Sequence, residues 1–359
     1  MPQKHVLFIK PTNSSFIRTD QKILENNYSV KVFLINQGKN KWKYFLHLFE
    51  LAFFLVKNAA KSKAFITWFG DYHAAVIVLF GRLLGKKTII FAGGQEAICY
   101  KELGKGVYLK KIRGVCVKYA LRNATLVLPN HHSLIYHENY FYNETHPHID
   151  GIKYYVPNLK CKIEVIPNGI DHNRIDRDKK IQKEEDLVLT VGTMNKVADF
   201  YNKGFDLFIE VALLCPDLRF VMISVKKEIL EWVETKYRVS ELPNLSIIPA
   251  FCPDDVLMEY YNRANIYVQV SITEGMPVSL SEAMLCECIP VGSNVNGIPD
   301  AIGPHGIIIY KRTPEELQNA IRKALKLDTG KSAREYTIAN FSVAVREKKL
   351  QEVLEKYIC

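Results

Sequence analysis

Short apolar runs rich in β-branched residues alternate along the chain with longer stretches that can form helices. Runs of this length and composition predict buried strands, and strands separated by helices predict βαβ units with a parallel sheet. We therefore expect two doubly wound α/β domains in tandem. The expected strands are 6–9, 30–35, 65–68, 88–91, 126–128 and 163–166 in the first half, and 187–191, 219–225, 245–249 and 266–270 in the second.

The length of 359 residues also favours two domains, because one hydrophobic core rarely serves so long a chain. The turn-forming sequence Pro167-Asn168-Gly169 marks a natural boundary and precedes a charged, weakly apolar stretch. We expect an N-terminal domain over 1–168, a linker over 169–186 and a C-terminal domain over 187–340. The last residues, 341–359, are expected to form a helix that packs back on the N-terminal domain.

A stretch over 42–60 is unusually aromatic. His47, Glu50 and Lys57 interrupt it, so it falls short of the roughly 20 apolar residues that a membrane span requires. The pattern favours a buried apolar helix, and an interfacial helix is the alternative. The lysines that flank it are Lys39, Lys41, Lys43, Lys61 and Lys63.

Composition is that of a globular protein, with 48% hydrophobic and 24% charged residues. The eight cysteines show neither the density of a disulfide scaffold nor paired metal-binding spacing, and the apolar run over 6–9 is too brief for a signal peptide. These features predict free thiols and a cytoplasmic location, where the protein could be peripheral on the membrane face.

The net charge of +10 is unevenly distributed. Residues 1–165 hold 24 basic and 10 acidic side chains, a balance of +14, whereas 166–359 hold 24 and 28, a balance of −4. A basic first half predicts an anionic partner, and the candidates are a phospholipid surface, a lipid-phosphate acceptor or nucleic acid. Nucleic acid is the weakest of these, because no groove-reading motif accompanies the basic residues.

The most informative segment is 271–284, Ser-Ile-Thr-Glu-Gly-Met-Pro-Val-Ser-Leu-Ser-Glu-Ala-Met. It predicts a strand end, a loop and then a helix with Pro277 in its first helical position. Such a turn directs the backbone N–H groups of Val278 and Ser279 at an anion, and Gly275 allows close approach because it has no Cβ. A diphosphate fits this arrangement.

Glu274 and Glu282 lie eight positions apart in this segment. Two carboxylates facing one phosphate would be repelled, so we assign them to hydroxyl groups, which can donate charge-assisted hydrogen bonds to them. Glu274 would then bind the sugar and Glu282 the ribose. The alternative is that both are acidic residues placed near a helix N-terminus by the helix dipole.

The segment resembles the E-x7-E signature of the retaining glycosyltransferases of family 4, where the run is E-G-x-P-x-x-x-x-E-A-M. Other positions agree: Pro167-Asn168-Gly169-Ile170-Asp171 resembles the interdomain motif of the family, and Val191-Gly192 with Lys203-Gly204 resembles its phosphate loop. Gly297-Ile298-Pro299-Asp300 is similar to the family's G-I-P-E turn. The resemblance covers about residues 160–310, and the members of the family that it resembles are those of the bacterial polysaccharide type.

The resemblance implies a GT-B fold, α/β with two Rossmann-like domains facing across a cleft, and transfer of a hexose from a nucleotide diphosphate sugar with retention of configuration. Glu274 and Lys203 would be catalytic, and no metal or other cofactor would be required. The leaving charge would then be neutralised by Lys203 and the helix N-terminus. Donor-binding residues would be Gly192, Lys196, Lys203, Glu274, Gly275, Met276, Pro277, Val278 and Glu282.

Two positions depart from the family pattern. An arginine usually follows V-G, and this chain has Thr193 there, so Lys196 is the candidate replacement. Many members also carry a histidine after the strand that here covers 88–91, whereas this chain has Gly93 and Gly94, which become the acceptor-side candidates. His131 and His132 follow the next strand and are interpreted as loop residues.

The triplet Asp176-Arg177-Asp178 matches the D-x-D metal motif of another glycosyltransferase fold, but it lies in the charged linker without a predicted strand around it. The predicted activity is transfer to a lipid-linked or surface-polysaccharide acceptor from a UDP- or GDP-linked donor. The alternatives are a nucleotide-sugar epimerase and a non-catalytic sugar-nucleotide binding protein, since one fold supports several functions.

Overall fold

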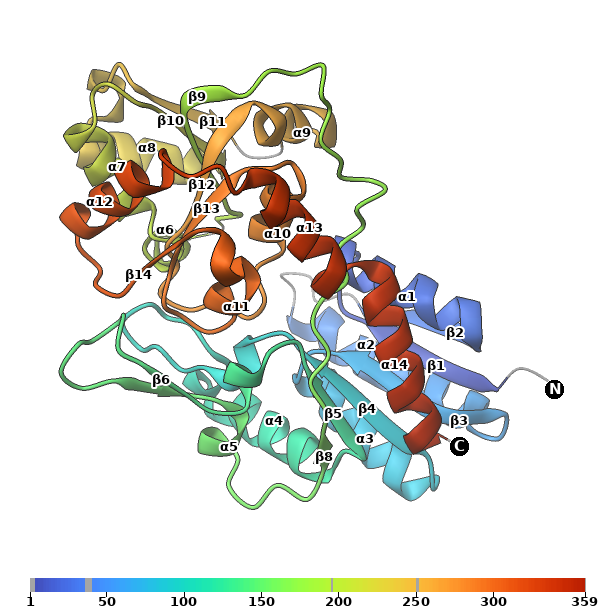
Figure 1. Ribbon diagram of the computed structural model, residues 1–359. Helices are drawn as coiled ribbons and strands as arrows, with labels where there is room; N and C mark the ends of the chain where they lie inside the picture. The colour runs from blue at the N-terminus through green and yellow to red at the C-terminus, as the bar shows by residue number, and fades with distance from the viewer. Residues whose placement is uncertain (1–3, 36–40, 195, 250–251, 359) are drawn as a thin grey trace. The chain divides into compact units, whose positions relative to one another are not determined.

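The computed structural model describes residues 4–35, 41–194, 196–249 and 252–358 (Figure 1). The chain forms two compact units, and each is described by itself. The N-terminal unit comprises Met1–His137, Ile149–Gly169 and Val343–Cys359, and the C-terminal unit comprises Glu138–His148 and Ile170–Ser342.

The N-terminal unit is built on a sheet that, in the described residues, has six parallel strands in the order β2-β1-β3-β4-β5-β8. The strands are β1 (His5–Lys10), β2 (Ser29–Leu34), β3 (Ser62–Trp68), β4 (Lys87–Ala92), β5 (Leu126–Pro129) and β8 (Lys162–Ile163). The helices are α1 (Ser15–Asn27), α2 (Lys41–Ala59), α3 (Tyr72–Leu83), α4 (Lys111–Asn123), α5 (Ile152–Tyr155) and α14 (Val343–Ile358).

The C-terminal unit has a second parallel sheet, again of six strands where the chain is described, in the order β11-β10-β9-β12-β13-β14. Its strands are β9 (Glu184–Val191), β10 (Arg219–Val225), β11 (Leu245–Pro249), β12 (Ala264–Gln269), β13 (Ile289–Ser293) and β14 (Ile307–Ile309). Its helices are α6 (Val197–Lys203), α7 (Phe205–Leu214), α8 (Lys227–Tyr237), α9 (Asp254–Arg263), α10 (Val278–Leu285), α11 (Ile298–Ile302), α12 (Pro314–Ala324) and α13 (Gly330–Phe341).

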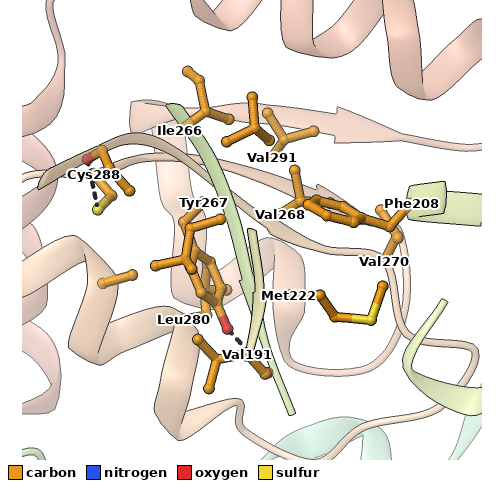
Figure 2. Close-up of a cluster of buried hydrophobic side chains, with 14 of the residues drawn as sticks. Val191, Phe208, Met222, Ile266, Tyr267, Val268, Val270, Leu280, Cys288 and Val291 are labelled. Carbon is orange, nitrogen blue, oxygen red and sulfur yellow. Dashed lines mark hydrogen bonds between the residues drawn. The ribbon is translucent and has the colours of Figure 1, made fainter. Parts of the chain in front are cut away.

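This strand order is typical of a doubly wound nucleotide-binding sheet: β10 and β11 are added on one side of β9, and the chain then crosses back to add β12, β13 and β14 on the other side. Both central strands are apolar on both faces because helices cover the sheet on each side. Figure 2 shows part of this core, where Val268 and Val270 pack with Phe208 and Met222. The predicted α/β fold class with two Rossmann-like units is confirmed.

The division of the chain differs from the expected boundaries in two places. Glu138–His148 belongs to the C-terminal unit, because Phe141 enters the core of that unit and Asn139 Nδ2 donates to the Ile272 carbonyl over 2.7 Å. The segment connects the paired strands β6 (His137–Asn139) and β7 (His148–Asp150) and includes residues of both. The stretch 170–186, expected as a linker, is also part of the C-terminal unit.

The C-terminal helix α14 lies in the N-terminal unit, where it runs beside α1 (Figure 1). Its buried face, Leu350, Leu354 and Ile358, joins the core that α1 forms with the sheet. Arg346, only 4% exposed, pairs bidentately with the buried Asp20 at 2.5 and 2.7 Å. The apolar stripe and this ion pair explain why the last helix packs where it does.

Helix α2 is neither wholly buried nor wholly exposed. Leu51 and Leu55 are buried against β1, β3 and α3, whereas Trp42, Phe49 and Phe53 face solvent. The expectation of a buried helix is therefore wrong for half of its circumference. No helix within the described ranges is long and apolar enough to cross a membrane, and the cytoplasmic location stays a prediction.

Candidate donor-binding site

The predicted strand, loop and helix of 264–285 are present in the C-terminal unit. β12 ends at Gln269, a loop follows, and α10 begins at Val278 with Pro277 in the N-cap position at φ −75° and ψ 112°. Pro277 thus lies one residue before the first helical position that we expected. Because a proline side chain has no acceptor, it cannot cap the first-turn N–H groups of Val278 and Ser279, which lie at the positive end of the helix dipole.

Hydrogen bonds from two neighbouring segments fix the loop before α10. The Glu274 N–H donates to Asn296 Oδ1 over 3.0 Å, and the Gly297 N–H donates to the Gly275 carbonyl over 3.1 Å. Asn202 Nδ2 donates to the Thr273 carbonyl over 3.2 Å. The backbone around Glu274, which is predicted to contact the sugar, is therefore held in place by residues of two other segments.

Lys203 and Glu274 form an ion pair at the centre of the site. Lys203 is the last residue of α6, and Glu274 lies on the loop after β12. Their side chains are 21% and 20% exposed. The two side chains are in contact and partly shielded from water. The cation can therefore bind a phosphate oxygen of a ligand while the carboxylate accepts a hydrogen bond from a neighbouring sugar hydroxyl.

Two glycines allow Lys203 to occupy this position. Gly204 ends α6 in the left-handed conformation at φ 73°, and a Cβ there would overlap the Val270 carbonyl and lie 2.8 Å from Val270 Cγ2. A Cβ on Gly192 would lie 3.4 Å from Cγ and Cδ of Lys203. The motif glycines thus bring α6 against the end of β12 and leave space for the lysine stem.

A buried polar chain links the strands beneath the loop to the start of α10. The Tyr267 hydroxyl lies 3.3 Å from the Val191 carbonyl and 3.2 Å from Gln269 Oε1. The bond to Val191 is one of the dashed lines in Figure 2. Gln269 Nε2 donates to Ser271 Oγ over 2.8 Å, and Ser279 Oγ donates to Gln269 Oε1 over 3.2 Å. Such a chain restrains the orientation of the first turn of α10, because its bonds between Val191, Tyr267, Gln269 and Ser271 are buried and the bond to Ser279 is partly buried.

Glu282 lies in the second turn of α10 and is 12% exposed. Its carboxylate accepts from Arg174 Nη2 at 3.2 Å and from the Tyr261 hydroxyl at 3.3 Å. Burial raises the pKa of Glu282 to about 7, against the opposing effects of Arg174 and Tyr261, and Asp254 adds to the rise. The group is therefore poised to change charge near neutral pH.

Arg174 and Tyr261 were not among the residues that the sequence analysis selected. Arg174 lies in the stretch interpreted as a linker, and it also pairs with Asp254 over 3.0 Å. Its position three residues after Asp171 of the P-N-G-I-D motif was the available signal. Tyr261 lies fully buried on α9. Its local sequence pattern is the same as that of a tyrosine that only packs in the core.

The remaining predicted donor residues lie on the same edge of the sheet. Gly275, Met276 and Pro277 are buried, and Val278 is half-buried. Lys196 is exposed at the N-cap of α6, seven residues before Lys203, so about 10 Å of helix separates their backbones. Whether Lys196 replaces the family arginine stays a prediction, as do the roles of the other site residues.

The D-x-D triplet is engaged in structural contacts. Asp176 pairs with Arg334 at 2.6 Å, and Asp178 Oδ1 accepts from the Lys180 N–H at 2.9 Å. Where the chain is described, no group of three or more His, Cys, Asp or Glu side chains could hold a metal ion. Metal independence stays a prediction.

The acceptor-side candidates Gly93 and Gly94 lie in the N-terminal unit, directly after β4. A Cβ on Gly93 would lie 2.5 Å from Phe69 Cε1, and Gly94 has φ 136°, which only glycine adopts readily. The Gly93 N–H donates over 3.0 Å to Glu96, whose fully buried carboxylate has its pKa raised by desolvation. Glu96 was not selected from the sequence. His131, interpreted as a loop residue, caps the short helix that starts at His132.

The fold and the site together define a class of protein. Solved structures with the same fold include sucrose-phosphate synthase from Thermosynechococcus elongatus, at a TM-score of 0.74 and 14% identity over 99% of each chain. HepE from Anabaena in complex with UDP-glucose matches at a TM-score of 0.70 and 14% identity, over 98% of this chain and 99% of that one. The fold is that of the GT-B glycosyltransferases.

Within this class, residues 171–341 match the family model of glycosyl transferases group 1. The match includes the whole loop and helix that carry Glu274 and Glu282. It starts at Asp171, so the segment that contains Arg174 lies within the matched region.

Curated relatives match the chain over part of its length. One component of the phosphatidylinositol N-acetylglucosaminyltransferase from Arabidopsis thaliana is 25% identical over 174 residues, which are 46% of this chain and 37% of the relative. The serotype-specific mannosyltransferase WbdA from Escherichia coli is 30% identical over 111 residues, 30% of this chain and 14% of the relative. The matches thus span well under half of these relatives. Both names are those of glycosyltransferases.

Proposed function

We propose that this protein is a retaining, metal-independent glycosyltransferase that transfers a hexose from a UDP- or GDP-linked donor to a lipid-linked or surface-polysaccharide acceptor. The observation that carries the proposal is the Lys203–Glu274 ion pair beside the N-terminus of α10, with Glu282 in the next turn. The family match over 171–341 and the GT-B fold support it.

In this proposal the donor diphosphate binds at the N–H groups of Val278 and Ser279, and Lys203 turns from Glu274 toward it. Glu274 accepts hydrogen bonds from hydroxyls of the sugar. Glu282, held by Arg174 and Tyr261, accepts hydrogen bonds from the ribose hydroxyls. Each charged group of the site then has a partner of opposite polarity on the donor.

The proposed reaction is a displacement on one face of the sugar. The acceptor oxygen forms a bond to C1 while the bond from C1 to the phosphate oxygen breaks and its electron pair stays with the diphosphate. The acceptor proton passes to that leaving oxygen, so no protein base takes part. Lys203 and the first turn of α10 stabilise the charge that grows on the diphosphate, which is the largest contribution such a site makes.

The acceptor class is supported by the basic N-terminal half and by the relatives, one named for phosphatidylinositol and one for serotype-specific mannosyl transfer. HepE, with the same fold, binds UDP-glucose. These observations favour a nucleotide sugar as donor and a glycan or lipid as acceptor, and no nucleic acid.

The test is a nucleotide-release assay with a panel of UDP- and GDP-sugars, run with and without a membrane lipid extract as acceptor. Transfer releases the nucleoside diphosphate only when acceptor is present, and the product keeps the anomeric configuration of the donor. An epimerase would change the sugar without releasing the nucleotide. If a nucleotide raises the melting temperature but neither transfer nor epimerisation is detected, the protein is a sugar-nucleotide binding protein without catalytic activity.

A further inference from the structure

The outward side of helix α2 is apolar. Trp42, Leu46, Phe49 and Phe53 are 81%, 61%, 74% and 68% exposed. Their spacings of four, three and four residues place them on one face of the helix. Side chains of this size are normally inside a protein, so a row of four in solvent marks a surface that contacts something else.

The two neighbouring helices extend this surface. α3 packs against both α2 and α4, so the three helices lie in one layer of the N-terminal unit. Each exposes further apolar side chains at helical spacing. We call the set of Trp42, Leu46, Phe49, Phe53, Leu79, Leu83, Ile112 and Val115 the outer face; its members on α3 and α4 are 44% to 72% exposed.

The charge of the same helices is almost entirely positive. The sequences of α2, α3 and α4 hold eight Lys and Arg residues and one acidic residue, Glu50. Lys43, Lys57, Arg82, Lys111 and Lys118 are exposed. Lys57 Nζ lies 6.0 Å from the centre of the Phe53 ring, so a cation and an aromatic ring lie side by side on this surface. Lys39 lies outside the described residues.

We propose that the outer face docks on an anionic lipid bilayer, with the side chains of Trp42, Leu46, Phe49 and Phe53 entering the boundary between headgroups and acyl chains. An apolar row bordered by lysines is the arrangement by which interfacial helices bind such surfaces. The proposal deepens the proposed function and rests on it, because a lipid-linked acceptor is presented at that surface.

A second copy of the chain is the less suitable occupant. Two outer faces in contact would bring together the five exposed cations of each copy with a single carboxylate on each, and like charges facing one another across an apolar contact are unfavourable. An anionic bilayer supplies both the apolar interior and the opposite charge.

The proposal is tested by co-sedimentation of the full-length protein with vesicles of phosphatidylcholine alone and of phosphatidylcholine mixed with phosphatidylglycerol. We expect binding to the mixed vesicles only, and its loss at high salt. The double variant Phe49→Ser/Phe53→Ser should weaken this binding about tenfold or more, since two large apolar contacts are removed. The matched control is Leu213→Ser, 58% exposed on α7 of the C-terminal unit, which should bind as the unmodified chain does.

Insertion of the outer face into the bilayer is measured separately by the fluorescence of Trp42, its most exposed side chain. Brominated lipids should quench tryptophan fluorescence in the unmodified chain and much less in Trp42→Phe. Of the other two tryptophans, Trp68 is 1% exposed, and Trp232 is half-buried on α8 of the C-terminal unit, which carries no part of the outer face. Vesicle binding that survives Phe49→Ser/Phe53→Ser unchanged would overturn the proposal. So would a dimer in sedimentation velocity that the same variant dissociates while vesicles fail to bind.

The assay uses no nucleotide sugar, so its outcome is independent of whether transfer is observed. Thermal unfolding of each variant verifies that the substituted side chains, which are exposed, leave the fold intact. Activity on a water-soluble acceptor should be unchanged in Phe49→Ser/Phe53→Ser.

Discussion

Arg174 Nη2 lies 3.2 Å from Glu282 Oε1, although the two residues are 108 positions apart. The contact joins the segment after the P-N-G-I-D motif to the second turn of α10, and it provides a cation to a carboxylate that is otherwise desolvated. Burial raises the pKa of Glu282, the predicted ribose-binding residue, and Arg174, a residue outside the E-x7-E motif, opposes that rise.

Nucleotide affinity should fall as the pH drops below about 7. Burial raises the pKa of Glu282 to about 7, and only the ionised carboxylate accepts from both ribose hydroxyls. Arg174→Gln should move the midpoint of the affinity profile to higher pH, because Arg174 opposes that rise. Calorimetric titration with UDP or GDP between pH 5.5 and 8.5 (about one and a half units on each side of that pKa) gives the profile. A profile unaltered by Arg174→Gln would contradict the assignment.

The same group affects folding in the opposite pH direction. Its pKa is higher in the folded state than the ordinary value of 4.5, so the folded chain binds the proton more tightly. The stabilising effect is present below about pH 4.5 and is lost as the pH rises toward 7. Glu282→Gln should flatten the dependence of the free energy of unfolding on pH across this window, as urea unfolding at several pH values will show.

The two glutamates should differ in what their loss does. Glu274→Ala is expected to lower turnover far more than it lowers nucleotide affinity, because the side chain is assigned to the sugar. Glu282→Ala should lower the affinity for the nucleotide itself, because that side chain is assigned to the ribose. Steady-state kinetics with each variant, together with UDP or GDP affinity, separate the two. Equal losses of nucleotide affinity would remove the distinction.

Lys203→Ala should cost about 2 to 4 kcal/mol of transition-state stabilisation, the scale of removing one donor to a developing anion. Lys196→Ala, at the far end of α6, is the matched control and should cost less if Lys203 is the main cation. The ratio of kcat/KM values measures both. Full activity of Lys203→Ala, or activity abolished by a chelator, would refute the metal-free mechanism.

Gly204→Ala should destabilise the fold more than Gly85→Ala. Both glycines have positive φ, 73° and 63°, which costs an alanine about 1 to 2 kcal/mol. A Cβ on Gly85 meets nothing within 4 Å, whereas one on Gly204 overlaps the Val270 carbonyl. Gly204→Ala should also reduce activity, because it displaces Lys203. Urea unfolding of the two variants gives the comparison, and equal losses would refute the close-approach argument.

Arg346→Met should destabilise the chain by about 3 to 5 kcal/mol, because it leaves Asp20 buried without its cation. Adding Asp20→Asn should recover part of the loss. In the unmodified chain Trp68 Nε1 donates to Asp20 Oδ2 over 2.9 Å, and an asparagine oxygen can still accept this bond. Lys356→Met on the same helix removes a surface ion pair with Glu164 and a contact with the Tyr357 ring, and it should cost less than about 1 kcal/mol. Chemical unfolding of the three variants measures these differences.

Much of the fold could be predicted because its signals are local. The limits expected for 219–225 and 245–249 are those of β10 and β11, and the loop before α10 is where its strand and helix pattern predicted it. β13 was missed because Pro290 and Gly292 are typical of turns. Gly292 is needed there since a Cβ would collide with Ile298 and Ile302 of α11.

The sequence by itself determined which residues carry the candidate chemistry: the two glutamates, the lysine before Gly204 and the start of α10. These are encoded within a few turns of chain, where backbone conformation and spacing are enough to identify them. The tertiary structure alone decided their partners, Arg174 and Tyr261 for Glu282 and Asn296 for Glu274. It also decided that α14 is held in the N-terminal unit by the pair of Arg346 with Asp20, and that half of α2 faces solvent. Such contacts depend on how distant segments pack, and no pattern within one segment specifies its partner in another.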